Sequence, residues 1–146
     1  PDARIVQTHR DPIKCMASTT SLLGTIYWMR SDQAFNAEMF ENIILGQATS
    51  CRLEKVMDQR AHGIIPDRNI TDSRYQDLMD DPMECIEQTY KHFAIELTKN
   101  TKARMLKYLE DKPKGKHGEH TYKVDNRAEE RTLFQRYQEC YQVPSE

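Results

Sequence analysis

The sequence predicts an α/β fold that is rich in helix and poor in strand. Only residues 3–8 form a convincing short run of β-prone residues. Much of the remaining chain carries apolar residues at steps of three and four, which is typical of amphipathic helices. A strand that leads directly into a helix is a unit of α/β architecture. We therefore expect a helix-rich part of an α/β fold, with few of its strands in these 146 residues.

The first strand and the first helix have clear local signals. Residues 3–8 are followed almost at once by Asp11 and Pro12. Aspartate is a favoured N-cap and proline is favoured at the first helical position, so a helix is expected over residues 12–29. Gly24 weakens the helical pattern of this stretch.

The later elements follow from the same kinds of signal. We expect a helix over 32–60, a polar second strand over 68–75, a turn over 76–81, a helix over 82–93, a helix over 99–109 capped by Thr98, a loop over 112–120 and a helix over 128–141.

Two short strands do not make a sheet that is stable alone. Either the fold is mostly helical, or other strands of the sheet come before this sequence. The strand–turn–helix opening is typical of the middle of an α/β protein. No repeat or linker divides the chain, so we expect residues 1–146 to be a single domain.

Composition excludes several classes of protein. Twenty-one basic and twenty-three acidic residues give a net charge of −2, which argues against binding nucleic acid through bulk charge. No stretch is apolar for long enough to span a membrane. The four cysteines are scattered without a CxxC pattern, which argues against a metal site and favours reduced thiols in the cytoplasm.

The end of the first strand is a candidate anion site. Arg10 lies where the strand ends and the helix begins, and ligands of open α/β sheets bind at the carboxyl ends of strands. Free N–H groups at the helix start and the guanidinium both suit a phosphate. Ser18 lies seven residues after the Asp11 cap and shares that helix face. The alternative is that Arg10 pairs with Asp11 or a helix carboxylate, while Ser18 faces solvent.

A second candidate is the basic, glycine-containing loop over residues 112–118. Lysine side chains and exposed backbone N–H groups there can fold over an anion. The loop matches neither a P-loop nor a dinucleotide-binding pattern, and its simpler interpretation is a solvated surface loop.

The histidines form no catalytic pattern. We expect His9 and His92 to be packed in the structure, whereas His117 and His120 lie in the basic loop where either could face a ligand. A general base needs a partner and a pocket, and the sequence assigns neither. The catalytic residues therefore stay unassigned.

Three segments carry a family resemblance. Residues 1–12, with Lys14 and Ser18, resemble the 3′-phosphate-binding segment of the bacterial sulfotransferases. Residues 74–78, followed by Asp81-Pro82, resemble that family's Tyr-x-Asp-Leu segment. Residues 113–122 are similar to its C-terminal Lys-Gly loop, and the three segments occur in the family's order.

The resemblance implies both a fold and a reaction. The fold is a P-loop-like three-layer α/β/α architecture with a parallel sheet, and the reaction transfers a sulfuryl group from 3′-phosphoadenosine-5′-phosphosulfate (PAPS) to a hydroxyl or amine of a small-molecule acceptor. Arg10 and Ser18 match the residues that hold the 3′-phosphate, and Tyr75 matches a tyrosine near the adenine. Lys114 and Gly115 match the loop that closes over the 3′-phosphate.

The family's glycine-rich 5′-phosphosulfate loop and its catalytic base lie upstream of the segments found here. The sequence therefore resembles the C-terminal part of a sulfotransferase domain, and we expect this chain alone to be inactive. The product nucleotide, adenosine 3′,5′-bisphosphate, is expected to bind.

Two other interpretations stay open. A non-catalytic helical interaction module would use exposed sheet edges and apolar helix faces, and could self-associate. A nucleotide kinase would need a Walker-type lysine, which the sequence lacks. Trp28, Phe35 and Met39 are expected in the core, with an apolar acceptor pocket as the alternative.

Overall fold

The computed structural model describes residues 2–40, 43, 46–112 and 128–146. These residues divide into two compact units. The first unit holds residues 2–9 and 65–112. The second unit holds residues 10–40, 43, 46–64 and 128–146.

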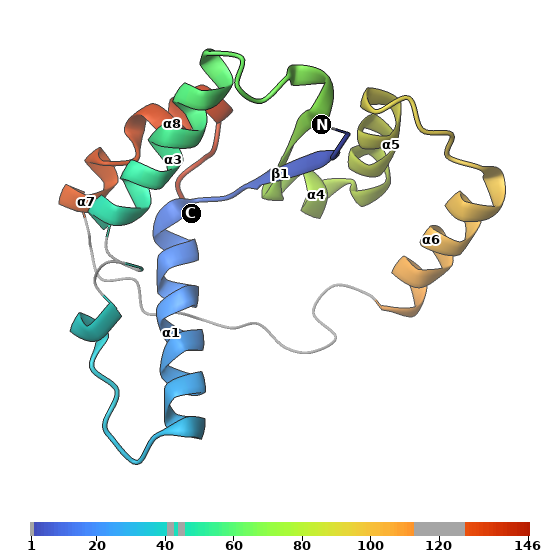
Figure 1. Ribbon diagram of the computed structural model, residues 1–146. Coiled ribbons are helices and arrows are strands. Elements are labelled where there is room, and N and C mark those ends of the chain that lie inside the picture. The colour runs from blue at the N-terminus through green and yellow to red at the C-terminus, as the bar shows by residue number, and fades with distance from the viewer. Residues whose placement is uncertain (1, 41–42, 44–45, 113–127) are drawn as a thin grey trace. The chain divides into compact units, whose positions relative to one another are not determined.

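The first unit contains a two-stranded parallel sheet (Figure 1). Strand β1 (Ile5–His9) pairs with β2 (Ile70–Arg74), in a register that runs from Ile5 opposite Ile70 to His9 opposite Arg74. Both strands predicted from the sequence are confirmed. Their parallel pairing puts both carboxyl ends at the same edge of the sheet.

Four helical elements complete the described part of the first unit. They are the 3₁₀ turn η2 (Asp67–Asn69) and the α-helices α4 (Tyr75–Asp80), α5 (Pro82–His92) and α6 (Lys99–Asp111). The Asp81 carboxylate accepts the Glu84 N–H at 2.9 Å at the start of α5, and the Thr98 hydroxyl accepts the Thr101 N–H at 3.2 Å at the start of α6. Both helices therefore begin where the sequence predicts, at Pro82 and Lys99, and each start is capped by a side chain.

The predicted turn over residues 76–81 is wrong, because this stretch forms α4. Its polar residues favour turns in isolation. Arg74 precedes the helix and donates from Nε to Asp77 Oδ2 at 2.6 Å. This contact between residues three apart stabilises the first turn of α4.

The regular elements in the described part of the second unit are all helical. This unit contains α1 (Pro12–Arg30), the 3₁₀ turn η1 (Ala37–Phe40), α3 (Gly46–Ala61), α7 (Ala128–Thr132) and α8 (Gln135–Tyr141). Ile13, Met16 and Phe134 form one buried cluster, and Met57, Tyr137 and Val143 form another. Leu53 on α3 packs against both clusters. The core therefore joins the start of α1, the middle of α3 and the C-terminal helices.

Two long helices predicted in this unit are interrupted. The helix expected over 32–60 is wrong at its start, where the Asn36 side-chain oxygen accepts the Glu38 N–H at 3.0 Å and begins η1. Such local bonding by asparagine competes with helix formation. The helix expected over 128–141 is interrupted at Leu133 and Phe134. There the Leu133 and Phe134 N–H groups bond to carbonyls three residues back, at Glu130 and Arg131, and the Phe134 side chain is completely buried.

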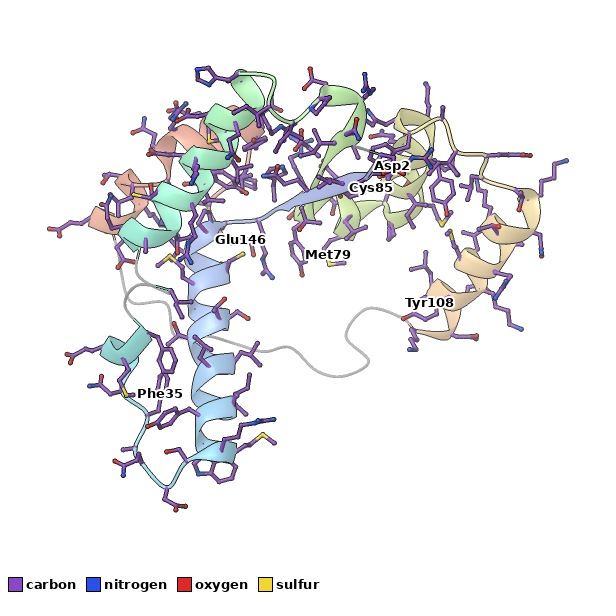
Figure 2. All side chains as sticks on the ribbon, in the orientation of Figure 1. Asp2, Phe35, Met79, Cys85, Tyr108 and Glu146 are labelled. Carbon is purple, nitrogen blue, oxygen red and sulfur yellow. The ribbon has the colours of Figure 1, made fainter. Side chains whose placement is uncertain are left out.

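The prediction that Trp28, Phe35 and Met39 lie in the core is also wrong. Trp28 is 79% exposed and Met39 is 62% exposed. Phe35, labelled in Figure 2, is half-buried and stacks on Phe40 with ring centroids 5.6 Å apart, while Tyr27 meets its edge at 6.0 Å. Helical spacing identified apolar positions here, but only the first turns of α1 have a core to pack against.

Candidate functional site

The carboxyl edge of the small sheet is where the sequence predicted a ligand site. His9 and Arg74 are the last paired residues of β1 and β2. The chain continues from His9 into Arg10 and from Arg74 into Tyr75. Tyr75, in the same unit as the sheet, therefore follows β2 at the edge where α/β proteins bind their ligands, and Arg10 is the residue that follows β1 in the sequence.

Asp11 is the fixed point at the start of α1. Its carboxylate is completely buried, and Oδ1 accepts the Ile13 N–H at 2.9 Å. This contact confirms the predicted N-cap. The other oxygen, Oδ2, accepts the Glu146 N–H at 2.8 Å and a bond from Arg131 Nη1 at 3.1 Å. One side chain thus caps the helix and also holds the C-terminal segment beside it.

Arg10 presents a two-pronged donor next to this buried carboxylate. Its Nε donates to Glu146 Oε1 at 2.9 Å, and its Nη2 donates to Glu146 Oε2 at 2.7 Å. The residues that form this pair are 136 positions apart in the sequence. The carboxylate in this fork is that of Glu146, which lies beyond the last helix, whereas the expected alternative was Asp11 or a helix carboxylate. A fork of this kind recognises carboxylates and phosphates with the same geometry.

Ser18 lies on α1, half-buried, in the same unit as Arg10. The helix runs without interruption from Pro12 past Ser18, so the seven-residue step from Asp11 returns to nearly the same face. Ser18 already has an interaction partner in this structure.

The other predicted binding residues are distributed differently. Tyr75 is the first residue of α4, half-buried, and belongs to the first unit. Lys114 and Gly115 lie outside the described residues, as do His117 and His120. The structure therefore describes three of the five predicted binding residues, with Arg10 and Ser18 in one unit and Tyr75 in the other.

A pair between the buried His9 and the exposed Asp72 joins the two strands near the carboxyl edge of the sheet. His9 is 1% exposed, which confirms the prediction that it is packed, and its Nε2 lies 2.8 Å from Asp72 Oδ1. Sequence reasoning missed Asp72. Only the parallel register, which sets Asp72 opposite Gln7, shows that it comes within reach of His9.

The thiol of Cys15 reports the electrostatics of the start of α1. Burial raises its pKa above the ordinary value, Arg10 lowers it, and Glu146 and Asp11 raise it by smaller amounts. A raised pKa keeps the thiol protonated at neutral pH, so Cys15 lacks the thiolate character of a nucleophile. Among the described residues, no group of three or more His, Cys, Asp or Glu side chains could hold a metal ion.

A model of the sulfotransferase family matches residues 1–99, which is more than half of the sequence. The chain belongs to the sulfotransferase family. The matched span contains Arg10, Ser18 and Tyr75, and ends before Lys114 and Gly115. No match is found among curated proteins.

The fold of this sulfotransferase-family chain is similar to that of a solved enzyme. Sulfotransferase STF9 from Mycobacterium avium matches with a TM-score of 0.68 and 22% sequence identity, over 99% of this chain and 37% of that one. The predicted helix-rich α/β fold with a parallel sheet is confirmed. The chain spans little more than a third of the length of that enzyme. Over the described residues, no helix is both long and apolar enough to span a membrane.

Proposed function

We propose that this chain supplies the 3′-phosphate and adenosine side of the PAPS site of a sulfotransferase. The observation that carries the proposal is the Arg10 fork, which already grips an anionic group through Nε and Nη2 beside the start of α1. Membership of the sulfotransferase family supports the class of reaction. Bound PAPS would supply the sulfuryl group for transfer to a hydroxyl or amine of a small-molecule acceptor.

The residues of the chain contribute binding and orientation. In the proposed complex, Arg10 donates two hydrogen bonds to the 3′-phosphate and Ser18 donates one from its hydroxyl. Tyr75 lies near the adenine, and Lys114 and Gly115 belong to the loop that closes over the phosphate. The capping and clamping bonds of Asp11 fix the backbone that carries Arg10. No residue of this chain is assigned as the catalytic base, so we expect binding without appreciable turnover by the chain alone.

Calorimetric titration with adenosine 3′,5′-bisphosphate tests this proposal. The variant is Arg10→Ala, and Arg30→Ala, at the far end of the same helix, is the matched control. Truncating a buried charge pair costs about 2–5 kcal/mol. The Arg10 side chain is 37% exposed, so we expect the low end of that range, a loss of roughly 30-fold in affinity.

Adenosine 5′-monophosphate, which lacks the 3′-phosphate, completes the design. Wild type should prefer the bisphosphate, and Arg10→Ala should lose most of that preference while Arg30→Ala keeps it. Equal affinities of wild type and Arg10→Ala for the bisphosphate would show that Arg10 does not hold the 3′-phosphate.

A second candidate function is a non-catalytic interaction module. It is favoured by the exposed apolar side chains of α1, among them Leu22, Ile26, Trp28 and Met29. The same titration separates the two candidates. A chain that self-associates in sedimentation and binds no nucleotide would support the module. Under either candidate function, the free cysteines fit a reducing compartment such as the cytoplasm.

A further inference from the structure

Glu146 is held against the start of α1 by both its backbone and its side chain. Its N–H donates to Asp11 Oδ2 at 2.8 Å, and its backbone oxygen accepts from Arg131 Nη2 at 3.3 Å. Its carboxylate takes both prongs of the Arg10 fork. Figure 2 labels Glu146 at the N-terminal end of α1. The backbone contacts do not depend on the side chain, so the carboxylate can leave Arg10 while the backbone stays anchored.

The Glu146 carboxylate makes the contacts that a phosphate would make. A carboxylate offers two oxygens to Nε and Nη2 of an arginine, and a phosphate offers two oxygens with the same geometry. One guanidinium edge cannot serve both groups at once. We propose that Glu146 is an intramolecular competitor for the 3′-phosphate, occupying the Arg10 fork until the nucleotide displaces it. This inference rests on the function proposed above.

The Arg10–Glu146 ion pair is weak enough for a phosphate to displace the carboxylate. The Arg10 and Glu146 side chains are 37% and 27% exposed, so water screens the pair and its strength is modest. A phosphate monoester carries up to two negative charges at neutral pH against one on the carboxylate, and it binds the fork more strongly. Only molecules in which Glu146 has left the fork can bind the 3′-phosphate. The apparent affinity for the nucleotide is therefore the intrinsic affinity multiplied by the fraction of molecules with an open fork.

The test compares the affinities of Glu146→Gln and wild type for adenosine 3′,5′-bisphosphate, using the full chain. The amide keeps the size of the side chain and removes its charge. Glu139→Gln is the matched control, because it removes the same charge from the same unit and its carboxylate accepts instead from Gln135 at 2.8 Å. We expect Glu146→Gln to bind about fivefold tighter than wild type and Glu139→Gln to bind as wild type does.

The titration distinguishes a competing Glu146 carboxylate from one that orients Arg10 or acts through its charge alone. Tighter binding by Glu146→Gln that disappears in the Arg10→Ala background supports the competitor. Equal or weaker binding by Glu146→Gln overturns it, because Glu146 would then be neutral or would orient Arg10 for the phosphate, and the proposed function would survive. A gain that persists without Arg10 also overturns it, since the cause would be general charge. Failure of both wild type and Glu146→Gln to bind the bisphosphate would overturn the inference and the proposed function together.

Discussion

Replacing Asp11 with alanine should destabilise the start of α1 by more than the loss of one helix cap. The Asp11 carboxylate accepts from the Ile13 N–H, the Glu146 N–H and Arg131 Nη1. It is completely buried, so the replacement leaves three donors without their acceptor at a site that water reaches poorly. The perturbation therefore removes a cap and a clamp together.

The magnitude can be worked out donor by donor. Loss of the cap to the Ile13 N–H costs about 1 kcal/mol. The part-buried Glu146 N–H adds about 1 kcal/mol when it loses its partner. Arg131 is 31% exposed and can be rehydrated, so it adds about 0.5–1 kcal/mol. The sum for Asp11→Ala is about 3 kcal/mol.

The chain contains its own control for this prediction. Asp81 precedes Pro82 as Asp11 precedes Pro12, and it caps α5. Asp81 is exposed, and its carboxylate accepts the Glu84 N–H at 2.9 Å. Asp81→Ala should therefore cost about 1 kcal/mol, the loss of the cap alone.

Amide hydrogen exchange is the suitable assay, because the two caps lie in different units and each helix can be followed separately. Asp11→Ala should speed exchange in the first turns of α1 by roughly 150-fold, and Asp81→Ala should speed exchange in α5 by roughly fivefold. Similar accelerations in the two helices would refute the conclusion that Asp11 stabilises α1 through three donors.

Two further predictions follow from burial. Burial raises the pKa of Cys15, so its stabilising contribution is present below the unfolded thiol's pKa and is lost as pH rises through the folded-state pKa. Cys15→Ser should reduce the fall in unfolding free energy as pH rises above about 8.5, the ordinary thiol value, and an unchanged fall would contradict this. Ile13 is 2% exposed, so Ile13→Ala should lower the free energy of unfolding by about 3 kcal/mol. Trp28 is 79% exposed, so Trp28→Ala should lower it by less than about 0.5 kcal/mol. Urea unfolding measures both costs, and equal costs would mean that the far end of α1 is packed.

Local signals in the sequence determined where most elements begin. Asp11 and Thr98 cap helices that start where these residues predict, because a cap binds an N–H only two or three residues further on. The two strands and the family resemblance were also readable without coordinates, since each depends on neighbouring residues. Arg10 stood out for the same reason, as a donor between a strand and a helix.

Only the tertiary structure decided which partners those residues meet. The Arg10 fork is filled by Glu146, and His9 meets Asp72 through a parallel register that no local pattern specifies. Periodicity could not tell that Ile13 is buried and Trp28 is exposed, although both are apolar residues of one helix. The physical reason is that burial and pairing depend on what the rest of the chain brings alongside a residue, whereas capping depends on the residue's immediate neighbours.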